Sequence, residues 1–341
     1  MVRFGGSARG SARPPGTADD SARWGVRWGG GPVERAGRVG PVERAGDDER
    51  LLAERFEEHR GRLRAVAYRM LGSLSEAEDA VQETWLKLSR TDAGDIRNLP
   101  AWLTTVTGRV CLDLLRSRVA RREEPMDTHV PDPVVSPLDR VDPEREALLA
   151  DSVGLALLVV LETLEPAERL AFVLHDMFAV PFDDIAPVVG RSSAATRQLA
   201  SRARRRVRGA SPEPEPDLAR QKEVLDAFLA ASRAGDFEAL LAVLDPEVVL
   251  RADSGGLVGG AAASKLVRGA ASVARQALMF RQFADSSRLA LVGGALGVVT
   301  APGGVPLAVM GVTVTDGRIA GMYILSDPER LARLDLSPFT G

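Results

Sequence analysis

Hydrophobic side chains recur at intervals of three and four residues from about Glu49 to residue 120, the spacing that places them on one face of an α-helix. The pattern predicts a first helix that ends at Gly72 and a second that begins at Ser75. A third helix is expected to begin near Asn98. Residues 49–120 are therefore predicted to form an all-helical unit. In the third helix, the side chains expected to be buried are Trp102, Leu103, Val106, Val110 and Leu114.

A second helical unit is predicted after a break in this pattern. Over residues 121–142 prolines alternate with Asp and Glu and the apolar periodicity is lost, which indicates an acidic, extended linker. Helical periodicity returns over residues 143–209. There, a short helix, a turn at Gly190 and a final helix capped by Ser192 or Ser193 are typical of a helix-turn-helix.

The last third of the chain has a different pattern. Prolines alternate with acidic residues in the linker over 210–217, which favours a semi-rigid extended segment. Residues 218–330 are predicted to form an α+β domain, followed by a tail over 331–341. The elements expected in this domain are two helices over 218–244, a helix near 262–283, strands over Val248–Ala252, 288–292, 296–300 and 306–315, and a type I′ turn at Asp316-Gly317 before a strand over Ile319–Leu325.

Residues 1–47 are rich in Gly, Arg, Ala and Pro, and contain the near-tandem repeat Gly31–Gly37 and Gly40–Gly46. Two Gly-rich units of this length are too short to stack as a solenoid, so the segment is predicted to be disordered. As an alternative, Trp24 and Trp28 form a small docking motif.

Composition excludes several classes of protein. Lys and Arg total 44 against 47 Asp and Glu, a formal charge of −3, and a hydrophobic fraction of 45 % provides each domain with a core. The sequence shows neither a stretch of about 20 apolar residues nor a signal peptide, and predicts a cytoplasmic protein. Cys111 is the one cysteine, and His59, His129 and His175 lack metal-ligand spacing. No disulfide, metal site or cofactor is expected.

The strongest chemical signal is the final helix of the helix-turn-helix, which carries arginines and no acidic residue from Arg191 to Arg208. Small residues at its start allow close approach to base edges, and its outer face offers donors to bases and phosphates. The alternative is a solvated basic helix. The residues expected to bind DNA are Ser193, Arg197, Gln198 and Arg202, with Arg204, Arg205, Arg206 and Arg208 on phosphates.

Two further surfaces carry charge. The third helix and its exit form a second basic surface, which indicates recognition of a second DNA element. Its members are Arg109, Arg116, Arg118, Arg121 and Arg122. The second helix instead presents an acidic strip from Glu76 to Lys87, which indicates either plain solvation or a protein partner.

The segments Glu78–Leu88 and Leu99–Leu115 resemble sigma region 2 of extracytoplasmic-function sigma factors, and the segment from Leu164 through Arg206 resembles sigma region 4. The resemblance covers residues 49–208. It implies that core RNA polymerase, through its β′ coiled coil and β flap, is the partner. It also implies reading of the minus-ten promoter element by residues 100–118 and of the minus-thirty-five element by Ser193 to Arg202. The residues it implies for polymerase binding are Asp79, Gln82, Glu83 and Trp85.

Residues 218–330 resemble a SnoaL-like domain of the nuclear-transport-factor-2-like fold, which regulates some of these sigma factors in cis. Asp253-Ser-Gly-Gly256 is similar to the Asp-Gly-Gly-Gly-Lys loop of that subgroup, although Leu257 replaces the lysine, and Asp327–Leu331 is similar to its Asn-Pro-Asp-Lys-Leu motif. The linker lacks the Trp-Leu that opens the subgroup's linker motif. The expected regulatory interdomain residues are Asp253, Gly255, Gly256, Asp327, Pro328 and Arg330.

Catalysis is not expected, because the C-terminal domain contains neither histidine nor cysteine. Acid–base work would fall to Asp226, Asp253, Asp285 or Tyr323. A small apolar ligand is an open alternative to an ordinary core. The residues that would line its site are Phe228, Leu250, Met279, Met310 and Tyr323.

The sequence therefore predicts a sigma factor with two all-α domains and an α+β regulatory domain. The near-neutral net charge fits a protein whose DNA affinity is completed by polymerase, and the acidic linker over 121–142 is expected to thread a basic channel of that enzyme. Two alternatives remain. A one-component, ligand-responsive helix-turn-helix repressor would bind its operator without polymerase, and a polyketide-cyclase-like enzyme tethered to DNA would need a catalytic base.

Overall fold

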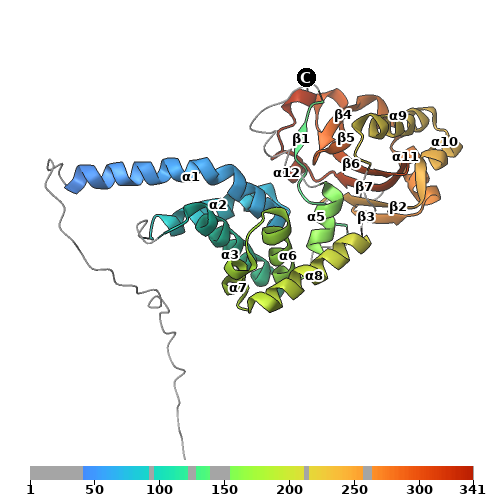
Figure 1. Cartoon of the computed structure of the whole chain (residues 1–341). Helices are drawn as coiled ribbons and strands as arrows, with labels where there is room; N and C mark the ends of the chain where they lie inside the picture. The colour runs from blue at the N-terminus through green and yellow to red at the C-terminus, as the bar shows by residue number, and fades with distance from the viewer. Residues whose placement is uncertain are drawn as a thin grey trace, which may run out of the picture. The chain divides into compact units, whose positions relative to one another are not determined.

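The computed structural model describes residues 41–91, 96–121, 128–138, 154–210, 215–255 and 263–340 (Figure 1). The tail up to residue 40, with Trp24 and Trp28, lies outside these residues, as do Arg122, Gly256 and parts of both expected linkers. The first helices are α1 (Pro41–Leu71), α2 (Leu74–Leu88) and α3 (Leu99–Ala120). The sequence predicts disorder up to residue 47, whereas α1 begins at Pro41. Proline is tolerated in the first turn of a helix.

The helical unit that these elements form follows from local capping and an apolar stripe. Ser73, two residues before the expected start, caps α2 by accepting the Glu76 N–H, and Asn98 caps α3 as expected. The core between α1, α2 and α3 includes Phe56 and Leu103. The prediction that Leu114 is buried was wrong, because it is 40 % exposed on the opposite side of α3 from Leu112 and Leu115.

The helix-turn-helix lies in the second helical unit. Its elements are α5 (Leu155–Glu162), α6 (Pro166–Phe172), a π-helical turn η2 (Val173–Met177), α7 (Phe182–Val189) and α8 (Ser193–Ala210). Gly190 ends α7 in the left-handed conformation, with φ 70°. The Ser192 hydroxyl accepts the Ala195 N–H and caps α8. Leu199, Ala200 and Ala203 form the buried seam of α8.

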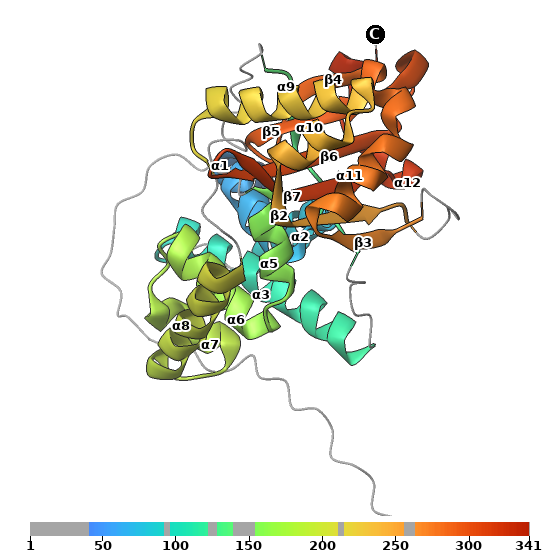
Figure 2. The ribbon, with the colours of Figure 1, turned by 90° about the vertical axis from the view of Figure 1, so that its right-hand side faces the viewer.

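The C-terminal part contains a seven-stranded mixed sheet in the order β1-β4-β5-β6-β7-β2-β3. Its elements are α9 (Leu218–Ala234), α10 (Phe237–Val243), β2 (Leu244–Asp253), β3 (Lys265–Arg268), α11 (Ala270–Met279), the 3₁₀ helix η4 (Arg281–Ser286), β4 (Ser287–Val292), β5 (Ala295–Thr300), the 3₁₀ helix η5 (Pro302–Gly304), β6 (Ala308–Thr315), β7 (Arg318–Leu325), α12 (Pro328–Leu331) and the 3₁₀ helix η6 (Ser337–Phe339). Strands β2 and β7 are parallel, and the other pairs are antiparallel. Figure 2 shows α9, α10 and α11 against one face of this sheet.

Strand β1 (Val135–Ser136) belongs to the segment that the sequence predicts to be an extended acidic linker. Val135 pairs with Val292 of β4 and Ser136 with Leu291, so β1 adds an edge strand to the C-terminal sheet. The view of this segment as an unpaired spacer was therefore wrong for the described residues 128–138. Its valines bury apolar surface that an isolated linker would leave in water.

The sheet buries both of its faces, because successive side chains point to opposite sides. On β7, Met322 and Ile324 pack under α9, α10 and α11, whereas Tyr323 and Leu325 face the other side. The expected Asp316-Gly317 turn is confirmed, with φ 50° and 73°. The helix expected near 262–283 is divided into β3, α11 and the first part of η4.

Candidate nucleic-acid interface and interdomain junction

Helix α8 carries the candidate DNA-binding side chains on its exposed face. Arg197, Gln198 and Arg205 are exposed. The guanidinium of Arg197 lies 5.6 Å from the ring centroid of Phe182, which orients it at the start of the helix. The Ser193 hydroxyl donates a hydrogen bond to Asp183 of α7. The structure thus places these four predicted residues along one accessible side of the helix-turn-helix.

Other arginines of α8 form ion pairs within the protein. Glu168 of α6, whose side chain is only 5 % exposed, accepts Arg202 Nε at 2.6 Å and Arg206 Nη1 at 3.2 Å. Arg204 Nε lies 2.6 Å from Asp176 Oδ1. These pairs fasten α8 to α6 and η2. The sequence predicts only DNA contacts for these arginines, so their structural role is an addition. Arg202 remains half exposed, so its other donors still face solvent.

The second basic surface is only partly assembled. Arg109 and Arg116 of α3 are exposed, and Arg116 lies 3.9 Å from Asp113. Arg118 is half-buried and forms an ion pair with Glu76 of α2. The exposed arginines are available to a phosphate backbone, whereas Arg118 links α3 to α2.

The acidic strip on α2 contains the residues predicted to bind polymerase. Asp79 and Gln82 are exposed, and Glu83 pairs with Lys87 one helical turn later at 3.0 Å. Trp85 packs at a ring distance of 5.1 Å on Phe56 of α1. The four predicted residues therefore lie along one helix, three polar and one aromatic.

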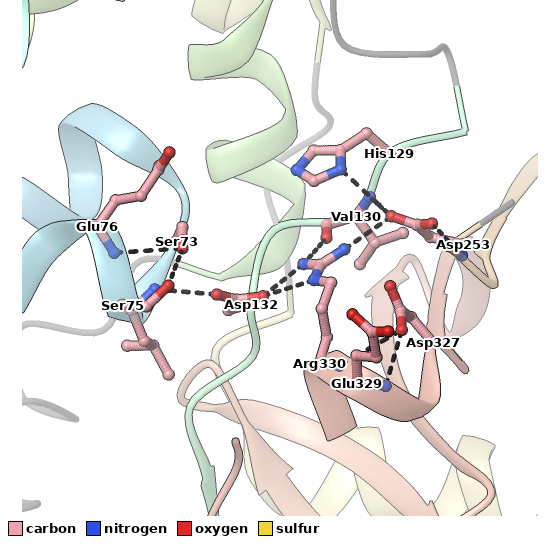
Figure 3. Close-up of polar contacts among 12 residues, drawn as sticks. Ser73, Ser75, Glu76, His129, Val130, Asp132, Asp253, Asp327, Glu329 and Arg330 are labelled. Atoms are coloured by element: carbon pink, nitrogen blue, oxygen red, sulfur yellow. Dashed lines mark hydrogen bonds and ion pairs between the residues drawn. The ribbon is translucent and has the colours of Figure 1, made fainter. Parts of the chain in front are cut away.

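A polar junction joins the segment around β1 to the C-terminal domain (Figure 3). At its centre Arg330 of α12 donates to Asp132 Oδ1 through Nε at 2.8 Å and Nη2 at 2.6 Å. Its Nη1 donates to Asp253 Oδ2 at 2.8 Å, and Nη2 also reaches the Val130 carbonyl at 2.5 Å. One guanidinium thus links the end of β2 to the segment that precedes β1.

Asp132 extends the junction to the first helical unit. Its Oδ2 accepts the Leu74 N–H at 3.0 Å, and its own N–H donates to the Gly72 carbonyl at 2.8 Å. The Tyr68 hydroxyl donates to the Asp132 carbonyl. Asp132 therefore connects the α1–α2 turn to Arg330, and only 9 % of it is exposed.

His129 and Asp253 form the charged side of the junction. His129 Nδ1 lies 3.2 Å from Asp253 Oδ2, and Nε2 lies 3.5 Å from Glu162 Oε1. Burial alone would lower the pKa of His129, but these carboxylates raise it to about 9. Burial alone would raise the pKa of Asp253, but hydrogen bonds from His129, Gly255 and Val130 lower it to about 2. At neutral pH the pair is therefore ionised.

The predicted interdomain residues differ in what they contact. Asp253 and Arg330 reach the segment before β1, as described above. Asp327 instead caps α12, accepting the N–H groups of Glu329 and Arg330, and thereby fixes the base of the arginine. Gly255 has φ +69°, and a Cβ there would lie 2.3 Å from Asp327 Oδ2, so only glycine fits. Pro328 occupies the first turn of α12 and is exposed.

Sequence reasoning missed the partners of these residues, His129, Val130 and Asp132, because they lie in the predicted linker. A signal was present. Val130, Val134 and Val135 are apolar residues in a segment rich in prolines and acids. Three such side chains indicate a segment that packs against another part of the protein.

The C-terminal domain also holds an apolar cavity of about 300 Å³. Phe228, Leu250 and Met310 line it, as expected from the sequence. Met279 and Tyr323 do not: Met279 is 56 % exposed, and Tyr323 lies on the opposite face of the sheet. Among the residues that the structure describes, no cluster of histidine, cysteine and carboxylate side chains forms a metal site.

A helix-turn-helix with an arginine-rich second helix, a further helical unit and an α+β domain together define a multidomain transcription factor. The chain matches the family models for Sigma-70 region 2 over residues 55–121 and Sigma-70 region 4 over residues 154–207. It is 41 % identical over 289 residues to the ECF RNA polymerase sigma factor SigJ of Mycobacterium tuberculosis, covering 81 % of this chain and 91 % of that protein. It is 43 % identical over 199 residues to a probable ECF RNA polymerase sigma factor SigI of the same species, covering 58 % and 68 %.

The crystal structure of M. tuberculosis extracytoplasmic function sigma factor SigJ matches with a TM-score of 0.68 and 38 % identity, over 83 % of this chain and 99 % of that one. The protein belongs to the family of extracytoplasmic-function RNA polymerase sigma factors. The predicted fold class is confirmed as two helical sigma regions followed by a C-terminal domain of helices and a mixed sheet. Sigma factor function is favoured over the repressor alternative, and this family is not one of catalysts. No helix in the described ranges is long and apolar enough to cross a membrane.

Proposed function

We propose that this sigma factor binds core RNA polymerase through the exposed side of α2, contacts promoter DNA through α3 and α8, and is held closed by its C-terminal domain until polymerase or another signal opens it. The polymerase-binding residues in this proposal are Asp79, Gln82, Glu83 and Trp85. The DNA-binding residues are Arg109, Arg116, Arg118, Ser193, Arg197, Gln198, Arg202 and Arg205. The site of action is the cytoplasm, where RNA polymerase works.

A core shared by the two helical units and the sheet supports a closed state. Leu112 of α3, Leu170 of α6 and Val292 of β4 are each at most 1 % exposed and belong to one continuous apolar cluster. The two promoter elements implied by the family lie about 25 base pairs apart, or roughly 85 Å at about 3.4 Å per base pair. Because packed domains cannot span that distance, promoter binding requires the two helical units to separate.

Through the segment around β1, the C-terminal domain opposes separation of the two helical units. While Val135 pairs with Val292 and Asp132 is bound by Arg330, residues 128–138 cannot extend between separated domains or thread a polymerase channel. We propose that β1 leaves the sheet when the sigma factor engages polymerase. The acidic linker then becomes available to a basic channel, as the sequence predicts.

Run-off transcription with purified core polymerase tests this proposal. Arg330→Ala removes the central cation of the junction, whereas Arg333→Ala removes an exposed arginine from the next turn and serves as the matched control. At limiting sigma factor we expect at least a tenfold gain in transcript from Arg330→Ala and none from Arg333→Ala. Equal or lower transcription by a folded Arg330→Ala protein would contradict the closed state.

The polymerase-binding face is tested separately by co-purification with core polymerase. Asp79→Arg reverses a charge on the exposed strip of α2, and Glu58→Arg makes the same change on the exposed surface of α1. We expect the first variant to lose the complex and the second to retain it. Retention of the complex by both would assign the strip on α2 to solvation.

A further inference from the structure

The apolar cavity of the C-terminal domain has the dimensions of a binding site for a small molecule. Its volume of about 300 Å³ is equivalent to about ten water molecules at about 30 Å³ each, and it lies at the lower end of the range for ligand sites. Phe228 of α9, Phe280 and Phe283 line it together with Met310 and Met322 from the sheet. A molecule of about ten to fifteen non-hydrogen atoms would fill this volume and bury its own apolar surface.

One edge of the cavity is accessible. Leu307, which precedes β6, lines the cavity and is also 38 % exposed. Val305, two residues earlier, is 67 % exposed. Large aliphatic side chains exposed at this edge form an apolar surface by which an apolar molecule could enter the cavity.

The polar groups around the cavity select an acid. Lys265 carries the one charge among the described lining residues, and its ammonium lies 5.9 Å from the ring centroid of Phe280, so it stands beside the aromatic part of the lining. Gln276 also lines the cavity, and its buried Nε2 has no hydrogen-bond partner. A buried donor without an acceptor is rare in folded proteins and marks a place for one. By contrast, Ser287 and Thr300 bond to each other at 2.9 Å.

We propose that this cavity binds a small apolar monocarboxylic acid, with its tail among the phenylalanine and methionine side chains and its carboxylate near Lys265 and Gln276. The positive charge excludes an apolar amine, and the lack of a second cation in the described lining makes a monoanion a better match than a dianion.

The cavity adjoins the interdomain junction through two strand ends. Ala252 near the end of β2 and Ser326 after β7 both line the cavity, and the next residues are Asp253 and Asp327. The Ser326 N–H donates to the Asp253 carbonyl at 2.8 Å, which ties the two ends together. A ligand that orders these ends strengthens the hold on the segment before β1. Because a tighter hold on this segment favours the closed state proposed above, on which this inference rests, the acid would inhibit transcription.

Calorimetry on the full-length protein tests the binding step, with octanoate as the probe and octanol and octylammonium as controls of the same chain length. We expect octanoate to bind at least tenfold more tightly than either control. Lys265→Met should abolish this preference and Gln276→Leu should weaken octanoate binding, whereas Lys222→Met, a change at an exposed lysine on α9, should leave it intact. No heat of binding with octanoate, or equal binding of octanol by the native protein, would overturn the assignment.

Run-off transcription with and without saturating octanoate tests the coupling. Native protein should lose at least half its activity, while Arg330→Ala should be active and insensitive to the acid. If octanoate binds but native transcription does not fall, the coupling is refuted and the binding site stands. If Arg330→Ala shows no gain over native protein, the closed state fails instead, and calorimetry still decides the ligand.

Discussion

The strength of the interdomain junction can be measured by replacing Arg330 and Asp132 singly and together. The side chain of Arg330 is 17 % exposed and donates to Asp132 and Asp253, whose side chains are 13 % and 8 % exposed. Arg330→Met preserves apolar volume but leaves Asp132 without its cation and Asp253 with His129 alone. Removing one partner of a buried ion pair costs about 3–5 kcal/mol. The change should weaken the local closure of residues 128–138 by about that amount.

Asp132→Asn removes the charge and keeps an acceptor for the Leu74 N–H, so its cost should be smaller, about 1.5–3 kcal/mol. In the double variant neither a guanidinium nor a carboxylate is left buried without its partner at this pair. The combined loss should therefore fall short of the sum of the single losses by about 1–3 kcal/mol, the coupling expected for side chains in direct contact.

Hydrogen–deuterium exchange of the full-length protein is the assay, because the amides of Val130 and Asp132 are bonded across the junction. A loss of about 3 kcal/mol should accelerate exchange of residues 128–138 in Arg330→Met by about 100-fold, with the α9 core unchanged. Two results would refute the reasoning: acceleration below about threefold, or equal acceleration throughout the chain, which would mean general unfolding.

Three further predictions concern single groups. The pKa of His129 rises from 6.5 to about 9 on folding, so its stabilisation is complete below pH 6.5 and is lost as the pH approaches 9; the Tm difference between native protein and His129→Gln should be larger at pH 6 than at pH 9.5. Gly255→Ala should lower the Tm more than Gly190→Ala, since both glycines have positive φ but only the first new methyl meets Asp327. Arg205→Ala should reduce the salt dependence of holoenzyme binding to promoter DNA by about one phosphate contact, measured as the slope of log affinity against log salt.

The helices were predictable from the sequence because their signals are local. Caps at Asn98 and Ser192, the turn at Gly190 and the repeat of apolar residues every three or four positions all lie within a few residues of the structure they determine. The Asp316-Gly317 turn was predictable for the same reason. The exposure of Leu114 was not, because the width of the buried stripe on α3 depends on which neighbours cover it.

The junction was only half predictable. Arg330 and Asp253 were singled out through a family motif, but their partner Asp132 stands 198 residues from Arg330 in the chain. No local pattern encodes a pairing at that separation, and β1 is only two residues long. The arginines of α8 show the same limit. Composition indicates a basic helix, yet only the fold shows that Glu168 holds two of them.

The free energy of closing the interdomain junction determines how tightly polymerase must bind the open form of the sigma factor. If the proposed closed state lies about 3 kcal/mol below the open one, the open form is populated to about 1 %, and the apparent affinity for polymerase is about 100-fold weaker than that of the open form. A sigma factor of this kind competes poorly at low concentration and is released by any event that weakens one contact at Asp132 or Asp253. Because each ionic contact is worth a few kcal/mol and the junction is compact, a modest perturbation moves the equilibrium through most of its range. In the proposed closed state, control by the C-terminal domain requires no large rearrangement within that domain, only a change at the strand ends that carry Asp253 and Asp327.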